Sequence, residues 1–261
     1  MGIRTIDETS RYKYELLTGQ GRASDVSVGD SVRTFYIHKG SAVLSNLRSS
    51  GGHIEERLLN AGEGFIATPG AIYSLDISDS DFVALQTSSP AKGDIYEIVD
   101  DGHSKQEVII PGHRIITNPK FVSKPWGHEL WISWLRDHHV LKQIGMTTDK
   151  KSSLQLHRDK LETNYLVEGI ADVIDGYRMD VNLPEEAMKE IARKVDWDSY
   201  KTRKLPGDFW TNVPGVVHRV ISASSYIAYE TSTPELDDVI RLNDDANRAS
   251  GRIAEEHLQK K

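Results

Sequence analysis

An internal repeat constrains the fold of this chain more than any other feature of the sequence. The segment "GEGFIATPGAIYSL" (62–75) lies over "GDFWTNVPGVVHRV" (207–220) without a gap, at an offset of 145 residues. Upstream, "TFYIHKGSAV" (34–43) lies over "TNYLVEGIAD" (163–172) at an offset of 129. The superimposed pairs include Gly62 and Gly207, Pro69 and Pro214, Gly70 and Gly215, and Tyr73 and His218. Two copies of one structural unit are the simplest account of this match.

The repeated unit consists mainly of strands. Short runs rich in β-branched and aromatic residues alternate with Gly, Pro, Asp and Ser, which is typical of an all-β barrel or sandwich. The second copy carries 145 − 129 = 16 extra residues, and they fall on 182–197, which has the pattern of a helix. We expect Asn182 to cap this helix and 184–195 to form its body. A further helix is expected from about 245 to the C-terminus.

Composition excludes several classes of protein and of site. The chain is 38% hydrophobic and 27% charged, which predicts a globular protein with a substantial core. We find no run of 18 apolar residues and no secretory signal, and the net charge of −7 argues against nucleic acid as a partner. A cytoplasmic protein that acts on a small molecule is therefore expected. Cysteine is absent, so any metal must be held by nitrogen and oxygen atoms.

Four residues in the second half have the types and spacing of metal ligands. Gln155 and His157 are two residues apart, so on a strand both point to one face. Glu162 follows the charged run 158–160, which we interpret as a turn that brings its side chain back to that face. His218 begins a strand after the turn "VPGVV". Two imidazoles, one carboxylate and one amide oxygen suit one divalent ion: zinc is our first choice, and Mn, Fe, Co and Ni stay open.

At these residues the sequence resembles the cupin superfamily. The first cupin motif, H-x-H, three or four residues, Glu, six residues, Gly, matches 155–169 with Gln155 in place of the first histidine. The second motif, Gly, five residues, Pro-x-Gly-x-x-His, matches 207–218 with Val213 at the proline position. The resemblance implies two double-stranded β-helix (jelly-roll) barrels, with the inserted helix in the second. It also implies a homodimer.

Within the superfamily, the second half resembles the cupin domain of type II mannose-6-phosphate isomerases. The Gln-x-His-x-x-basic-x-Glu pattern carries this resemblance, together with "KPWGHELW" (124–131) and "YETSTPELDDVIRLNDDANR" (229–248). The sequence departs from that family at Asn164, where tryptophan is usual. Asp149 and Ser222 are further departures from the cupin motifs, at positions usually held by glycine and asparagine.

The first half offers a different set of side chains at the corresponding positions. We expect a metal-free cupin over 1–112 and a metal-binding cupin over 113–261, with the boundary within 108–120. By the two offsets, the counterparts of the four ligands are Val26, Val28, Arg33 and Tyr73, and among them only the tyrosine is a plausible ligand.

The resemblance leads us to expect a metal-dependent sugar or sugar-phosphate isomerase or epimerase that acts through an enediolate. The candidate catalytic bases are Glu230 and Glu129. The candidate substrate-binding residues are Lys124, Trp126, Lys160, Arg219 and Arg241. On a regular strand, however, Arg219 would point away from His218. Trp126 and Trp210 could pack on a sugar face, although packing in the core is the more common role of such residues.

Two other functions remain open from the sequence. Two histidines and a carboxylate are the minimum ligand set of a non-haem iron dioxygenase, although a fourth ligand at Gln155 would leave less room for oxygen and substrate. A non-catalytic sugar-binding bicupin of polysaccharide biosynthesis is the other alternative. The inserted helix 184–195 could serve as a lid or as a dimer contact.

Overall fold

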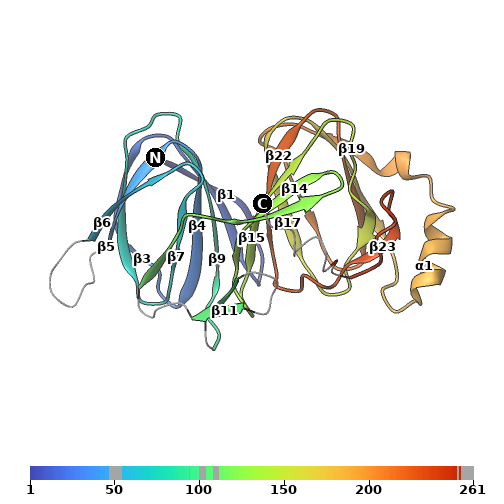
Figure 1. Ribbon diagram of the computed structural model, residues 1–261, viewed down its shortest axis with the longest axis horizontal. Helices are drawn as coiled ribbons and strands as arrows, with labels where there is room; N and C mark the ends of the chain where they lie inside the picture. The colour runs from blue at the N-terminus through green and yellow to red at the C-terminus, as the bar shows by residue number, and fades with distance from the viewer. Residues whose placement is uncertain (47–54, 94, 100–103, 108–111, 252, 254–261) are drawn as a thin grey trace. The chain divides into compact units, whose positions relative to one another are not determined.

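The computed structural model describes residues 1–46, 55–93, 95–99, 104–107, 112–251 and 253 (Figure 1). These residues form two compact units. The first holds Met1–Lys120 together with Ile132–Leu141, and the second holds Phe121–Trp131 and the described residues from Lys142 onward. The strand β12 pairs with β7 of the first unit, and the limit of this unit at Lys120 lies within the range 108–120.

Almost all regular structure is β. The strands up to residue 116 are β1 (Gly2–Glu8), β2 (Lys13–Thr18), β3 (Gly21–Ser27), β4 (Ser31–Lys39), β5 (Ser41–Asn46), β6 (Glu55–Asn60), β7 (Gly64–Ala67), β8 (Ile72–Ile77), β9 (Val83–Pro90), β10 (Tyr96–Val99), β11 (Ser104–Glu107) and β12 (His113–Ile116). They form a six-stranded sheet of order β1-β2-β9-β4-β7-β12, a four-stranded sheet of order β3-β8-β5-β6, and the hairpin β10-β11.

The later elements repeat this plan with an insertion. They are β13 (Lys120–Lys124), β14 (Gly127–Trp134), β15 (Val140–Met146), β16 (Leu154–Leu156), β17 (Glu162–Glu168), β18 (Ala171–Arg178), α1 (Glu185–Ala192), the 3-10 helix η1 (Trp197–Tyr200), β19 (Lys201–Lys204), β20 (Phe209–Asn212), β21 (Val216–Ser222), β22 (Tyr226–Ser232) and β23 (Ile240–Asn243). The sheets have the orders β13-β14-β15-β22-β17-β20 and β19-β18-β21-β16-β23.

Strand register confirms the internal repeat. In the first unit Val26 of β3 pairs with Tyr73 of β8, and in the second Gln155 of β16 pairs with His218 of β21. These are the correspondences expected from the sequence, so the two halves place equivalent residues at equivalent points of the sheets.

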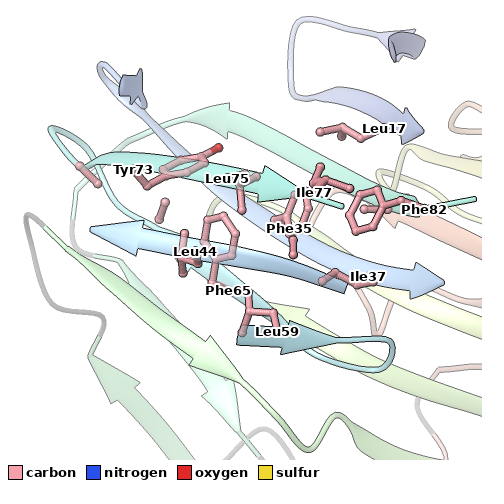
Figure 2. Packing of buried hydrophobic residues seen from close by; sticks show 14 of the residues in the cluster. Leu17, Phe35, Ile37, Leu44, Leu59, Phe65, Tyr73, Leu75, Ile77 and Phe82 are labelled. Carbon is pink, nitrogen blue, oxygen red and sulfur yellow. The ribbon is translucent and has the colours of Figure 1, made fainter. Parts of the chain in front are cut away.

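The interior of the first unit is filled by apolar side chains from both of its sheets. Phe35 of β4 stacks on Phe65 of β7 with ring centroids 5.0 Å apart, and Phe65 meets the edge of Tyr73 of β8 (Figure 2). At the position that corresponds to Glu162, Arg33 donates a 2.6 Å hydrogen bond to the Tyr73 hydroxyl. A guanidinium group in this place repels a cation, which is consistent with the proposal that this unit does not bind metal.

The inserted helix packs against the outer face of the five-stranded sheet. Met188 and Ala192 of α1 are buried among residues of β16, β18, β21 and β23. Residues of α1 are not among those that line the main cavity described below, so the structure does not support a lid, and a dimer contact stays untested. Pro184 occupies the N-cap position, and the predicted cap Asn182 instead donates to Asp180.

The second predicted helix is wrong over 245–251, which forms turns and bends. Asp244 starts this segment by accepting hydrogen bonds from the Arg248 backbone and guanidinium. The rest of the predicted helix lies outside the described residues, apart from residue 253, which is not helical. The described part of the chain contains no helix with the length and hydrophobicity that crossing a membrane requires.

A buried histidine of the first unit predicts how stability depends on pH. His139 is fully buried, with Nε2 2.9 Å from the Thr34 hydroxyl and Nδ1 2.8 Å from the Ser89 hydroxyl. Burial and, to a smaller extent, the neighbouring His138 lower the pKa of His139 to about 3. The unfolded chain therefore binds a proton more readily, and this contribution to stability is present above pH 6.5 and is lost as the pH falls toward 3.

We expect the contribution of His139 to decrease by about 2 kcal/mol between pH 7.5 and pH 5. Urea unfolding of the wild-type protein and of His139→Gln at both pH values measures this, because glutamine keeps a donor and an acceptor but does not titrate. The variant should lose less stability than the wild type on acidification. Equal losses in the two proteins would show that His139 does not determine the pH dependence.

Candidate metal centre

The four expected ligands come from the strands of the second unit. Gln155 lies in β16, His157 directly follows that strand, Glu162 opens β17 and His218 lies in β21. The odd spacing between His157 and Glu162 is accommodated by the turn at 158–160. One ligand atom from each of His157, Glu162 and His218 lies within 4.8 Å of the other two, and all three residues are buried.

Asp238 organises the turn between the ligands. Its carboxylate accepts hydrogen bonds from three consecutive backbone N–H groups, those of Arg158 (3.0 Å), Asp159 (2.6 Å) and Lys160 (3.0 Å). Its backbone carbonyl also accepts a hydrogen bond from His157 Nδ1. One aspartate thus fixes both the turn and the orientation of a ligand ring, a role that the sequence interpretation missed.

Both histidines present Nε2 to the shared carboxylate. His157 Nδ1 bonds to the Asp238 carbonyl and His218 Nδ1 to the Val216 carbonyl at 3.0 Å. Because a carbonyl oxygen only accepts, each neutral ring carries its hydrogen on Nδ1 and has its lone pair on Nε2. His157 Nε2 lies 3.6 Å from Glu162 Oε2, and His218 Nε2 lies 3.3 Å from Glu162 Oε1.

These three side chains fit a divalent metal ion. Atoms bound to one ion at metal–ligand distances near 2.1 Å lie about 3–3.5 Å apart, close to the separations seen here. His157 Nε2 is buried and has no hydrogen-bond partner in the described structure, which a metal would explain. Burial lowers the pKa of His218 to about 4, so this ring is in the neutral, metal-binding form at pH 7.

Gln155 reaches the cluster but presents the other end of its amide. Its Nε2 lies 3.3 Å from His218 Nε2, and its Oε1 accepts a 2.5 Å hydrogen bond from the Ser153 hydroxyl. A ligand role would require a half-turn of the amide, after which Nε2 would donate to Ser153 and Oε1 would face the centre. As arranged, three residues rather than four offer ligand atoms.

A buried lysine links the cluster to one of the two candidate bases. Lys160 Nζ donates to Glu162 Oε2 at 2.5 Å and to Glu230 Oε1 at 2.8 Å. Burial alone would lower the pKa of Lys160, but the two carboxylates outweigh it and raise that pKa above its usual value. For Glu162 the direction is opposite: burial alone would raise its pKa, but Lys160 and both imidazoles hold that pKa well below its usual range. Glu162 is therefore ionised, as a ligand must be.

The cluster opens into a cavity of about 130 Å³ within the second unit. Of the candidate residues from the sequence, those that line it are Lys124, Trp126, Glu129, Gln155, His157, Lys160, Glu162, His218, Glu230 and Arg241. Arg219 does not line it, and its assignment to substrate binding is corrected. Its side chain lies on the opposite face of β21 and donates to the carbonyl (3.0 Å) and side-chain oxygen (2.9 Å) of Asn243.

Arg241 lines the cavity but has a structural role. Its Nη1 donates to the carbonyls of Ala249 and Gly251, the latter at 2.7 Å, and its backbone N–H donates to the Ser250 hydroxyl. Ser250 in turn donates to Glu185 of α1 at 2.8 Å. Arg241 thus holds the segment after β23 in place, so it is less available for an anion than the sequence suggested.

Glu129 lies at another part of the cavity lining, where donor groups surround it. Trp131 Nε1 donates to it at 2.6 Å, and the ammonium groups of Lys124 and Lys142 lie 3.5 and 3.7 Å from its oxygens. Lys142 Nζ also lies 4.7 Å from the centre of the Trp131 ring. The sequence interpretation missed Lys142, although its alternation with Val140 and Ile144 in β15 placed a lysine on the buried face.

The chain is similar in structure to several solved proteins. The Mn(II)-containing oxalate decarboxylase of Bacillus subtilis is 10% identical, with 92% of this chain and 74% of that chain covered and a TM-score of 0.59. The protein YlbA of Escherichia coli is 9% identical (86% and 77% covered, TM-score 0.55), and the Lactobacillus farciminis oxalate decarboxylase, solved as a formate complex, is 11% identical (88% and 78%, TM-score 0.55). No protein-family model and no curated protein matches the sequence.

At this level of identity the likeness shows the fold. Together with the two-sheet units and the strand register, it establishes an all-β cupin fold with two barrels. None of these three structures is described as an isomerase. The resemblance to mannose-6-phosphate isomerases therefore depends on the sequence motifs alone.

Proposed function

We propose that the second unit binds one divalent metal ion through His157, Glu162 and His218 and isomerises or epimerises an anionic sugar, such as a sugar phosphate. The observation that carries this proposal is the shared orientation of the two imidazoles toward one ionised, buried carboxylate. The ion-paired Lys160 and Glu230 beside the centre supply groups for proton transfer.

The charge of the cavity supports an anionic substrate. Five basic side chains and three carboxylates line it, although the whole chain carries a net charge of −7. Lys124 and Lys142 share the single carboxylate of Glu129 at distances longer than a good hydrogen bond. Both lysines line the cavity, and in this proposal their ammonium groups bind a phosphate or a carboxylate of the substrate.

Glu230 is the better placed of the two candidate bases. Among the described residues, Lys160 donates to Glu230 Oε1 and no group donates to Glu230 Oε2. The Glu230 side chain lines the cavity beside the centre. Glu129 has contacts to donors on both oxygens. In this proposal Glu230 moves the proton between neighbouring carbons, and Lys160 holds its carboxylate in position. The metal ion, when bound, supplies positive charge beside the substrate oxygens.

NMR in D₂O combined with metal analysis tests this function. The wild-type protein should carry about one equivalent of divalent metal per chain and should exchange the C2 proton of a hexose 6-phosphate for deuterium. Glu230→Gln should keep the metal and lose the exchange, because the amide cannot accept the proton. Loss of metal from Glu230→Gln, or unchanged exchange in it, would contradict the assigned role. Sugar binding without exchange in the wild type would instead indicate the non-catalytic sugar-binding protein.

The arrangement of Gln155 favours one second candidate, a non-haem iron dioxygenase. With the Gln155 nitrogen facing His218, the ligands are two histidines and one carboxylate, which leaves positions open on an iron ion. This candidate predicts oxygen consumption by the Fe²⁺-loaded protein with an organic substrate. The isomerase predicts turnover without oxygen.

A further inference from the structure

The inner face of the six-stranded sheet in the second unit carries a row of polar side chains beside the candidate metal centre. Glu162 and Asn164 are two residues apart on β17 and both line the cavity. On one side they pair with Asn212 and Trp210 of β20, and on the other Asn164 pairs with Glu230 of β22. Asn164, Trp210 and Asn212, here called the polar wall, therefore form one continuous surface next to Glu162.

The polar wall contains hydrogen-bonding groups that the described protein does not satisfy. Trp210 Nε1 and Asn212 Oδ1 are buried and have no hydrogen-bond partner among the described residues. Asn164, a residue that is 7% exposed, lines the same cavity, and its amide makes no hydrogen bond to a described residue. Buried polar groups in folded proteins are nearly always paired, because an unpaired group loses its bonds to water. These two groups, together with the Asn164 amide that lines the same cavity, point to a ligand that completes them.

The orientation of the Asn212 amide is determined by its neighbour. Asn212 Nδ2 donates to Glu162 Oε1 at 2.9 Å, and an ionised carboxylate only accepts. The amide nitrogen must therefore face Glu162, which leaves Oδ1 as an acceptor. Trp210 Nε1 is a donor only. The polar wall thus offers at least one fixed donor and one fixed acceptor to a ligand.

We propose that Asn164, Trp210 and Asn212 recognise neighbouring hydroxyl groups and so determine which sugars enter the reaction proposed above, on which this inference rests. A hydroxyl group both accepts and donates, so it can bind Trp210 Nε1 and Asn212 Oδ1. A phosphate or an ionised carboxylate accepts from Trp210 but cannot donate to Asn212. The anionic end of the substrate is then left to the basic part of the cavity, and the polar wall binds the hydroxylated part.

Titration calorimetry with matched ligands tests the polar wall. The probes are erythrose 4-phosphate, glucose 6-phosphate, mannose 6-phosphate and the 2-, 3- and 4-deoxy analogues of the two hexose phosphates. The wild-type protein should bind at least one hydroxylated ligand with an affinity at least about tenfold higher than that for one of its deoxy analogues, because the analogue leaves a buried group unpaired. Trp210→Phe removes only the N–H group, and Asn164→Leu removes the amide at similar volume. Each variant should weaken binding of the hydroxylated ligand and leave binding of that deoxy analogue nearly unchanged.

The indole N–H signals give a readout that does not depend on turnover. The chain has five tryptophans, and the signal missing from the ¹H–¹⁵N spectrum of Trp210→Phe identifies Trp210. That signal should shift downfield with the hydroxylated ligand and not with the deoxy analogue. Failure of every sugar phosphate to bind, equal affinity for hydroxylated and deoxy ligands, or equal weakening of both by Trp210→Phe would overturn the proposal. Hydroxyl discrimination without C2 proton exchange would refute the isomerase and keep the polar wall.

Discussion

The Glu162→Gln variant will bind a divalent metal ion at least about 100-fold more weakly than the wild-type protein, since loss of even an outer partner of a ligand costs 10–100-fold. Glu162 supplies the negative charge of the cluster, and it faces both imidazoles. The neutral amide removes the charge that attracts the ion and cannot bridge the two rings. Turnover of any metal-dependent reaction should be lost with the metal.

Thermal unfolding with and without Zn²⁺ or Mn²⁺ measures this effect without a known substrate. Metal at 100 times its Kd stabilises the folded protein by about 2.7 kcal/mol, a rise of several degrees in Tm. The wild type should show the rise and Glu162→Gln should not. Glu129→Gln is the matched control, because it removes another carboxylate of the same cavity and should keep the rise. An undiminished rise in Glu162→Gln would show that the ion binds elsewhere, and His218→Gln provides a second test.

The local part of this centre could be predicted from the sequence. Gln155 and His157 lie two residues apart on an extended segment, so strand geometry placed them on one face. His218 was assigned to the same centre through the second cupin motif, and the pairing of Gln155 with His218 agrees with this. Glu162 needed a turn at 158–160, which the charged run indicated. The inferences about Gln155, His157 and Glu162 depend on residues close in sequence, and the internal repeat then identified the equivalent positions in the two halves.

The partners of the centre could not be predicted, because they come from distant segments. Asp238 binds three backbone N–H groups of the turn from about 80 residues away, and nothing in an acidic run distinguishes such a residue from a solvated one. The sequence placed Lys160 near the ligands but did not indicate that it joins Glu162 to Glu230. The sequence does not indicate which end of the Gln155 amide faces the cluster, because the Ser153 hydroxyl can pair with either end.

The basic residues were the weakest part of the sequence interpretation. An arginine carries the same charge whether it binds substrate or backbone, so neither Arg219 nor Arg241 could be assigned without its contacts. The structure uses Arg219 against Asn243 and Arg241 against the carbonyls of 249–251. The C-terminal end of the inserted helix also differed from the prediction: α1 ends at Ala192, and Trp197 beyond it packs against Tyr177.

The Gly169→Ala variant should be destabilised by about 2–5 kcal/mol, the sum of a left-handed backbone (about 1–2 kcal/mol) and a steric clash (about 1–3 kcal/mol). Gly169 joins β17 to β18 with φ of +84°, and an added Cβ would lie 2.2 Å from the Ser225 carbonyl oxygen and 2.7 Å from Tyr226 Cα. These are backbone atoms of β22 and its preceding turn, so they cannot move without shifting the strand that carries Glu230. The clash thus acts on the core and on the candidate site together.

Two matched glycines separate the steric effect from the conformational one. Gly207 has φ of +98° with no atom within 4 Å of an added Cβ, so Gly207→Ala should cost only about 1–2 kcal/mol. Gly40, the counterpart of Gly169 in the repeat, has the same φ of +84°, but its nearest neighbours are the Asp79 and Phe82 side chains, at 2.9 and 3.2 Å. The destabilisation by Gly40→Ala should therefore fall between those of the other two variants, because side chains can rotate away.

Denaturant unfolding followed by tryptophan fluorescence reports mainly on the second unit, which holds four of the five tryptophans. If Gly169→Ala and Gly207→Ala unfold at the same denaturant concentration, close packing of β22 against the turn at Gly169 does not stabilise the second barrel.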